Sequence, residues 1–161
     1  MGVRVGEAAP GFECPAHDGS VVSLDRLRGR SVVLFFYPRD ETSICTKEAC
    51  GFRDSYERFK ELQAAVFGVS ADGRRSHQAF AGRHRLPFLL LCDEDRVLRR
   101  KFGVKRLLGL FDGRETFVID ESGIVRHVVR AAFSAGRHVE EALQTLQSLA
   151  AKRKAPITGS G

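Results

Sequence analysis

Cys45 and Cys50 lie five positions apart, in a segment whose apolar residues recur with helical spacing. A short loop, residues 38–42, leads into this segment from an apolar run. A cysteine reacts as the thiolate, and the unpaired N–H groups and the macrodipole at a helix N-terminus stabilise a thiolate. We therefore predict that Cys45 is a nucleophile presented at the first turn of a helix.

Three side chains close to Cys45 in the sequence fit this chemistry. Thr42 offers a hydroxyl that can hold an oxygen of the substrate and bond to the sulfur, and Pro38 can shield one side of the sulfur from solvent. Glu48 lies one helical turn after Cys45, so the two share a face. A carboxylate there disfavours a thiolate unless a cation intervenes, so we expect an arginine from elsewhere in the chain.

The same spacing limits how the two cysteines can pair. In a regular helix, residues five apart are separated by ~7.5 Å along the axis and ~140° around it, so their Cα atoms are roughly 8.7 Å apart. A disulfide needs less than ~7 Å between its Cα atoms. Pairing of Cys45 with Cys50 therefore requires the start of the helix to unwind, and we predict that oxidation and local unfolding are coupled.

The bulk properties indicate one globular domain. The chain has 161 residues, of which 43% are hydrophobic and 29% charged, as in ordinary globular proteins. We predict a single domain over residues 1–154 and a mobile tail over residues 155–161. No apolar run approaches the ~20 residues that cross a bilayer, and the first residues lack an apolar secretory segment. The expected location is the cytoplasm, or a plastid if a transit peptide has been removed.

Composition and spacing argue against two other classes of site. The formal net charge of +6 suggests a nucleic-acid role, but the arginines are scattered, and the densest basic cluster, residues 152–154, complements a helix C-terminus. Four cysteines are present: Cys14, Cys45, Cys50 and Cys92. There is no C-x-x-C pair and no finger-like histidine spacing, so no metal site is predicted. The helical histidines are interpreted as surface residues, and Cys14 and Cys92 as inert buried thiols.

Alternating strands and helices surround the Cys45 segment. Apolar runs predict buried strands at residues 31–37, 65–70 and 87–92. Ser70 or Asp72 is expected to cap the helix that follows the second of these strands. One helix is expected from about residue 43 along an apolar face made of Ala49, Phe52, Tyr56, Phe59 and Leu62.

The two ends of the chain are predicted to complete the sheet. Residues 115–120 and 124–129 read as a hairpin, and a final helix is expected over about residues 136–151. Residues 12–14 and 21–24 predict a small N-terminal hairpin. The loop 104–114 carries an apolar patch at residues 107–111, either packed over the site or open to a partner. These elements predict an α/β domain of three layers with a mixed central sheet.

The pattern P-x-x-x-T-x-x-C, filled by Pro38, Thr42 and Cys45, resembles the peroxidatic signature of the peroxiredoxins. A second cysteine five positions later, Cys50, is similar to the peroxiredoxin Q branch, also called bacterioferritin comigratory proteins. The likeness covers about residues 3–150. Within it, the serine-histidine segment at residues 76–80 and the loop at 107–111 look closest to plant and cyanobacterial members.

This resemblance implies a thioredoxin-like fold and a thiol peroxidase. Cys45 would attack a hydroperoxide, either hydrogen peroxide or an alkyl hydroperoxide, and become a sulfenic acid. Cys50 would resolve it as an intramolecular disulfide, which thioredoxin or a similar dithiol would reduce. Such an enzyme needs no metal, haem or flavin, and the family includes monomers and weak homodimers.

The resemblance also assigns roles to three residues around Cys45. Arg114 matches the family arginine that favours the thiolate and binds the peroxide. Glu48 matches the acid that orients this arginine, and Thr42 would hydrogen-bond the peroxide. The chain departs from the family at Ser43-Ile44, where Pro-Gly is usual. Because isoleucine is bulky and stiff at χ1, substrate access and unwinding are the properties that this departure affects.

Alternatives from other classes remain open at this point. Cys50 could be a buried helical residue, which would leave a one-cysteine peroxidase resolved by an external thiol. A thiol–disulfide oxidoreductase or redox sensor is a second possibility, although the absence of C-x-x-C counts against it. A basic structural or nucleic-acid-associated protein is a third, against which the lack of a focused basic face argues.

Overall fold

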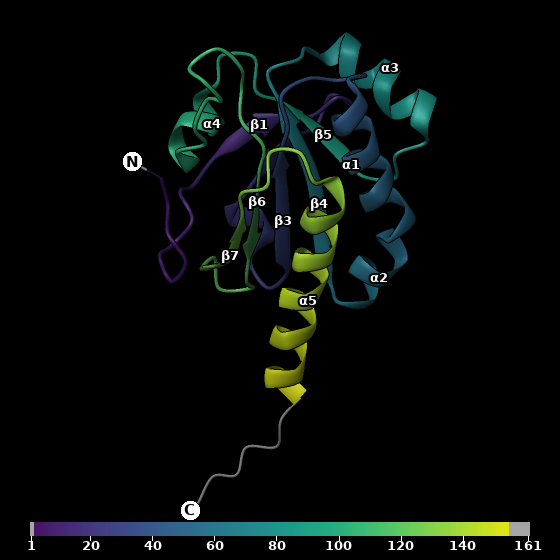
Figure 1. The fold of residues 1–161 in the computed structure, drawn as a ribbon. Coiled ribbons are helices and arrows are strands. Elements are labelled where there is room, and N and C mark those ends of the chain that lie inside the picture. Colours follow the sequence, from purple (N-terminus) through teal and green to yellow (C-terminus); the bar gives the residue numbers. More distant parts are fainter. Residues whose placement is uncertain (1, 155–161) are drawn as a thin grey trace, which may run out of the picture.

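The computed structural model describes residues 2–154, so the predicted tail at 155–161 lies outside the described residues. A five-stranded sheet forms the centre of the molecule (Figure 1). Its strands are β3 (Ser31–Phe36), β4 (Ala64–Ser70), β5 (Leu89–Cys92), β6 (Glu115–Ile119) and β7 (Val125–Val129). The order is β5-β4-β3-β6-β7, with β3, β4 and β5 parallel and with β6 antiparallel to both β3 and β7. The predicted mixed sheet is confirmed.

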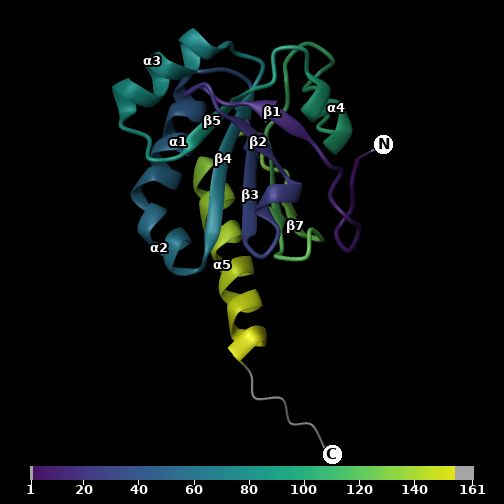
Figure 2. The same ribbon diagram turned by 180° about the vertical axis from the view of Figure 1, so that it is seen from behind.

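Helices and a small hairpin cover the two faces of this sheet. The helices are α1 (Ser43–Asp54), α2 (Tyr56–Glu61), α3 (Arg74–His84), α4 (Val97–Phe102) and α5 (Ala135–Lys154). Helices α1, α2 and α5 cover one face, with α5 crossing in front of the strands (Figure 1). The opposite face carries α4 and the predicted N-terminal hairpin, β1 (Glu13–Pro15) and β2 (Val21–Ser23), with a 3₁₀ turn, η1 (Asp25–Leu27), after it (Figure 2).

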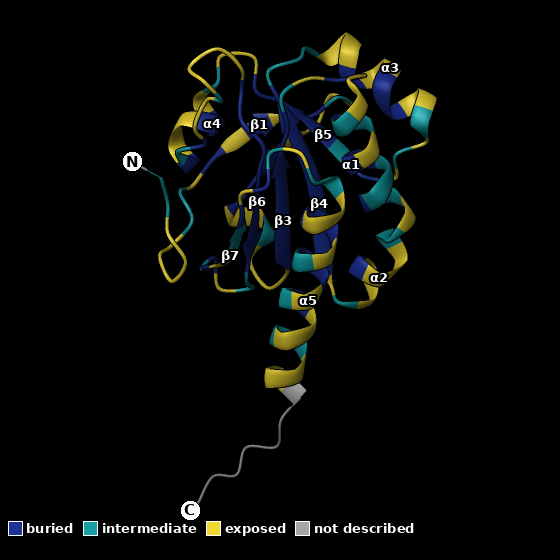
Figure 3. Cartoon of the chain, viewed as in Figure 1, coloured by how far each residue is buried: buried dark blue, intermediate teal, exposed yellow. Residues whose placement is uncertain are grey.

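Strand β3 holds the two layers together because its side chains alternate between the faces. Val32, Leu34 and Phe36 pack with the hairpin and α4, whereas the residues between them pack with α1, α2 and α5. Every residue of β3 is buried, as expected for a central strand covered on both faces (Figure 3). The end of β3 is therefore a fixed platform for the loop that follows.

The predicted single helix over residues 43–62 is wrong, because the chain breaks at Ser55 into α1 and α2. Ser55 has a ψ of 6°, far from the helical value. Serine tolerates this, since its side chain competes with helical hydrogen bonding. The apolar positions keep their predicted role, because Phe52 and Phe59 are both fully buried on either side of the break.

The predicted cap of α3 is also wrong. Gly73 occupies the N-cap position, and no side chain among the described residues caps it. The carboxylate of Asp72 instead accepts hydrogen bonds from the Ser70 hydroxyl at 2.6 Å and from the backbone N–H of Asp40 at 2.8 Å. Asp72 is therefore used to tie down the loop after β3.

The loop before β6 carries the predicted apolar patch. Leu108 is 90% exposed and Phe111 is 62% exposed, and Phe133, in the loop before α5, is 79% exposed. These side chains gather beside the end of β3 that carries the site described next. Among residues 2–154, no helix combines the length and apolar character needed to span a bilayer.

Candidate active site

Cys45 lies at the carboxyl end of the central strand, in the first turn of α1. Ligands of open α/β sheets bind beyond this end of the strands. Thr42 occupies the N-cap position of α1 with extended backbone angles. The backbone N–H of Thr46 donates to the Thr42 carbonyl at 2.8 Å. The N–H groups of residues 43–45 therefore lie at the end of the helix that lacks intrahelical acceptors.

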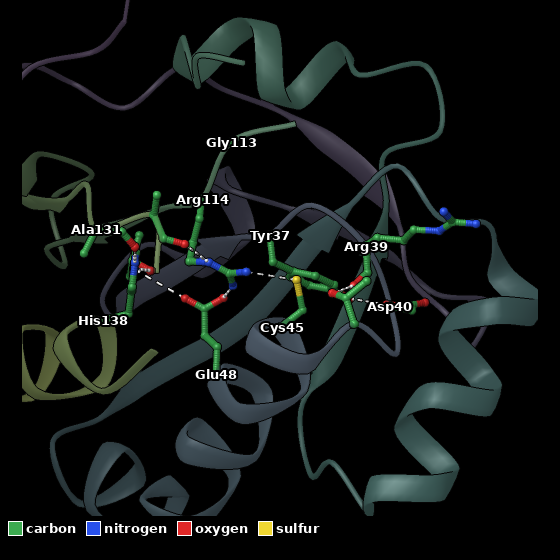
Figure 4. A network of polar contacts seen from close by, with 12 residues as sticks. Tyr37, Arg39, Asp40, Cys45, Glu48, Gly113, Arg114, Ala131 and His138 are labelled. Atoms are coloured by element: carbon green, nitrogen blue, oxygen red, sulfur yellow. Dashed lines mark hydrogen bonds and ion pairs between the residues drawn. The ribbon is translucent and has the colours of Figure 1, made fainter. Parts of the chain in front are cut away.

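Arg114 connects the sulfur of Cys45 to the carboxyl group of Glu48 (Figure 4). Its Nη2 donates to Sγ of Cys45 at 3.1 Å, and its Nη1 donates to Oε1 of Glu48 at 2.6 Å. Its Nε donates to the carbonyl of Ala132 at 3.1 Å, which fixes the plane of the guanidinium. All three residues of this group are buried. A cation beside the sulfur favours the thiolate. Arg114 is the arginine that we expected from the position of Glu48.

Glu48 is fully buried, and its two carboxyl oxygens differ. Oε1 accepts from Arg114, whereas Oε2 makes no hydrogen bond with any described residue. Nδ1 of His138 lies 3.4 Å from Oε2. Burial raises the pKa of Glu48 to about 7, although the charge and hydrogen bond of Arg114 act in the opposite direction. Desolvation outweighs the ion pair because a buried carboxylate is costly even beside a cation.

Pro38 and Thr42 line an apolar groove that opens at Cys45, with a cavity volume of about 610 Å³. Most of its wall is apolar and comes from Ile44, Leu107, Leu108, Phe111, Ala132 and Phe133. The hydroxyl of Thr42 donates to the Arg39 carbonyl at 2.9 Å, so its predicted bond to a peroxide stays a prediction. Ile44, one of the two residues at which the sequence departs from the peroxidatic signature that it resembles, is part of the wall.

All four cysteines are free thiols. Cys45 and Cys50 both belong to α1, so the geometric argument against their pairing in an intact helix applies directly. Cys45 is 1% exposed, whereas Cys50 is partly exposed. Burial raises the pKa of Cys14 to about 12 and that of Cys92 to about 11. Such thiols are inert at neutral pH, which agrees with their predicted role.

One group of polar residues has the composition of a metal site. Asp40, Asp72 and His77 place potential ligand atoms within 4.8 Å of one another. These atoms are engaged in hydrogen bonds, however. Asp40 Oδ2 lies 2.7 Å from Nδ1 of His77 and its Oδ1 accepts from the Tyr37 hydroxyl at 2.6 Å, while Nε2 of His77 donates to the Leu91 carbonyl at 2.9 Å. We interpret this cluster as a structural network that holds the loop before Cys45.

The prediction that the helical histidines are surface residues is wrong for His77 and His138, which are both 0% exposed. Each one has hydrogen-bond partners at both ring nitrogens, which permits burial. The signal that would have found them is helical spacing. His138 lies four residues before buried Ala142, and His77 lies three residues before buried Phe80.

Comparison with known proteins finds a matching family model and similar proteins. The model of the AhpC/TSA family matches residues 5–128. "Peroxiredoxin Q, chloroplastic" from Populus jackii is 47% identical over 148 residues, which cover 91% of this chain and 70% of that protein.

Two solved structures share both fold and sequence with this chain. Peroxidoxin BcpB from Mycobacterium tuberculosis has a TM-score of 0.84 and 40% identity, covering 91% of this chain and 97% of the other. Xanthomonas campestris bacterioferritin comigratory protein has a TM-score of 0.80 and 29% identity, covering 86% and 92%. The shared region therefore includes the whole sheet and the Cys45 site.

Proposed function

The chain belongs to the AhpC/TSA family and, within it, to the peroxiredoxin Q proteins, which makes it a peroxiredoxin peroxidase; on that premise we propose that Cys45 is the peroxidatic cysteine. Its thiolate attacks the terminal oxygen of a hydroperoxide, so that an S–O bond forms and the O–O bond breaks. The released alkoxide takes a proton and leaves as an alcohol, or as water from hydrogen peroxide. Cys45 becomes a sulfenic acid. The contact of 3.1 Å between Arg114 Nη2 and the Cys45 sulfur carries this proposal.

The residues around Cys45 have separate roles in the proposed reaction. Arg114 stabilises the thiolate and, from the same position, the negative charge that develops on the peroxide oxygens. The N–H groups at the start of α1 offer further donors to those oxygens. Thr42 and Pro38 sit at the groove wall, where a hydroxyl can hold the peroxide and a ring can exclude water.

We assign the resolving role to Cys50. Its sulfur attacks the sulfenic sulfur of Cys45, which releases water and forms an intramolecular disulfide. Because both cysteines lie in α1, this step requires the segment between them to leave the helical conformation. Thioredoxin or a similar dithiol then reduces the bridge by two successive exchanges. The proposed cycle uses sulfur chemistry alone, without metal, haem or flavin.

The apolar groove supports alkyl hydroperoxides as substrates in addition to hydrogen peroxide. An alkyl chain that leaves Cys45 along the groove meets Leu107, Phe111 and Phe133, and burial of each methylene contributes about 0.8 kcal/mol. The structure of the Xanthomonas campestris relative is described in terms of its alkyl peroxide reduction activity. We propose the same substrate class for this chain.

The names of the relatives bear on location. Curated relatives from poplar and rice are named as chloroplastic proteins, which is compatible with a plastid as the site of action. A monomer or weak homodimer is the proposed state. Sedimentation of the reduced and the oxidised protein over a range of concentrations distinguishes these two states from a stable larger assembly.

Titration with one equivalent of hydrogen peroxide tests the mechanism. We expect the loss of two thiols per chain, and peptide mapping should locate a bridge between Cys45 and Cys50. Cys45→Ser should abolish peroxide consumption, whereas Cys92→Ser is the matched control that should retain it. A stable sulfenic acid, or a bridge to Cys14, would contradict the assignment of Cys50. Peroxide turnover by Cys45→Ser would overturn the mechanism itself.

A further inference from the structure

Glu48 and His138 form a buried pair that the proposed reaction does not use directly. Both side chains are 0% exposed, and they belong to different helices, α1 and α5. Oε2 of Glu48 lies 3.4 Å from Nδ1 of His138 and has no hydrogen-bond partner among the described residues. In Figure 4, His138 lies on the far side of Glu48 from Cys45. His138 therefore lies behind Glu48, which contacts Arg114, and Arg114 in turn contacts Cys45.

The hydrogen bonds of His138 assign the proton on its ring. Nε2 lies 2.7 Å from the carbonyl oxygen of Ala131, which can only accept, so Nε2 carries a hydrogen. Nδ1 lies 2.7 Å from the hydroxyl of Thr116, which donates to the lone pair of a neutral ring. Oε2 of Glu48 lies 3.4 Å from the same nitrogen. An ionised Glu48 would place two lone pairs against each other, whereas a proton on Oε2 would be shared with Nδ1.

Burial of the two side chains favours the same arrangement, whereas Arg114 opposes a proton on Glu48. The pKa of His138 is lowered to about 4, chiefly by burial and also by the positive charges of Arg114 and Arg137, whereas the hydrogen bond to the Ala131 carbonyl and the charge of Glu141 act in the opposite direction. Arg114 is the charged group that faces Glu48, and burial still raises the pKa of Glu48 to about 7. Between about pH 4 and pH 7, the proton of the pair therefore sits on the carboxyl group, and the imidazole is neutral.

We propose that His138 is a positioning residue that keeps Glu48 protonated by accepting its Oε2–H at Nδ1, which leaves the charge of Arg114 for the Cys45 thiolate. A protonated Glu48 still accepts from Arg114 through Oε1, so the guanidinium stays oriented. The arrangement removes the conflict of a carboxylate next to a thiolate. Only its kinetic consequence depends on the proposed peroxidase function, because the proton on Glu48 can be measured by itself.

The direct test is the titration of the Glu48 carboxyl carbon by NMR in the reduced, full-length protein. His138→Leu should move this titration down by about one pH unit or more, a tenfold loss of proton affinity. The reason is that protonated Glu48 loses the acceptor for its Oε2–H. Ionised Glu48 keeps its bond to Arg114 and is no longer repelled by the lone pair of Nδ1. An unchanged or raised Glu48 titration would overturn the proposal.

The kinetic test follows the same variants by their reaction with hydrogen peroxide and with iodoacetamide from pH 5 to pH 9. His138→Leu should react about fivefold more slowly near pH 7, because most of its Glu48 is ionised there and neutralises Arg114. His138→Gln should restore most of the rate, since an amide offers both a donor to Ala131 and an acceptor to Glu48. His127→Gln, a partly exposed histidine paired with Glu141, is the matched control and should behave as wild type. A pH profile of His138→Leu that overlays wild type would contradict the link to Cys45.

Thr116→Val is a second variant that tests the proposal independently of a change at His138. It removes the hydroxyl that competes for Nδ1, so the bond from Glu48 should strengthen and its titration should move up. A downward movement or no movement would count against the proposal. If the wild-type protein lacks peroxidase activity but both variants move the Glu48 titration as expected, the pair stands and the proposed function fails.

Discussion

Nη2 of Arg114 lies 3.1 Å from the sulfur of Cys45, although 69 positions separate the two residues. The pairing of β3 with β6 brings them together. Phe36, near the start of the loop that leads to Cys45, is in register with Glu115, the residue after Arg114. Two neighbouring antiparallel strands thus place the nucleophile and its cation at the same end of the sheet.

Replacing Arg114 should therefore affect the chemical step. For Arg114→Gln we expect the second-order rate with hydrogen peroxide to fall about a hundredfold, the usual cost of losing one such donor. Arg114→Lys should lose less, because it keeps the charge but not the two-point contact. Arg126→Gln, an exposed arginine on β7 paired with Asp120, is the control. A rate for Arg114→Gln within twofold of wild type would contradict the assignment.

Oxidation should unwind the start of α1. We expect hydrogen peroxide to lower the helical circular dichroism signal and to expose the amides of residues 43–50 to hydrogen exchange. The reason is that the geometry of an intact helix keeps Cys45 and Cys50 too far apart for a disulfide. Cys50→Ser, treated in the same way, should keep its helicity. A bridged protein with unchanged protection of these amides would refute the coupling.

The apolar groove should determine the preference among hydroperoxides. Phe133→Ser removes an exposed ring from its wall, and we expect the KM for cumene hydroperoxide to rise about tenfold, as the loss of roughly two buried methylenes implies. Turnover of hydrogen peroxide should be unchanged, since it does not reach that wall. Val5→Ser, an exposed apolar residue elsewhere, serves as control. An equal effect on both peroxides would argue against substrate contact.

We expect folding to move a proton within the Glu48–His138 pair. Between pH 4.5 and pH 6.5, the ordinary values of the two groups, the imidazole carries this proton in the unfolded chain. In the folded chain the carboxyl group carries it, because its pKa rises to about 7 while that of His138 falls to about 4. Both states hold one proton, so the intact pair contributes no pH dependence to stability in this range.

Glu48→Gln should expose the contribution of His138. Because the pKa of His138 is lower in the folded state, its stabilisation is present above pH 6.5 and is lost as the pH falls toward about 4. Relative to wild type, the free energy of unfolding should drop by about 3 kcal/mol over this range. Urea unfolding at a series of pH values measures it, with the exposed Glu57→Gln as control. Parallel pH curves for Glu48→Gln and wild type would disprove the proton transfer.

Local spacing was enough to predict much of this site. Cys45, Thr42 and Pro38 follow from a strand, a loop and a helix start that are adjacent in the chain, and Glu48 follows from one helical turn. Arg114 came from its match to a family motif, because no local rule links residues so far apart. The mixed sheet was predictable for the same local reason, since its apolar runs are long and continuous.

What could not be predicted depends on packing between distant elements. The approach of His138 to Glu48 is set by how α5 lies on α1, which no spacing within either helix reveals. The break at Ser55 was missed because the apolar repeat continues through it, although a single residue left the helical conformation. Asp72 was expected to cap the helix that follows it, but its carboxylate instead accepts a hydrogen bond from the backbone N–H of Asp40, which lies in another loop.

The bonds around Asp40 bear on what happens after each oxidation. Tyr37, Ser76 and His77 hold its side chain, and Asp72 holds its backbone. No side chain among the described residues caps the start of α1. We therefore expect the loop to stay in place while the first turns of the helix open. When the disulfide is reduced, the loop still has the conformation of the reduced protein. The Cys45 thiol can therefore return to Arg114 without a conformational search.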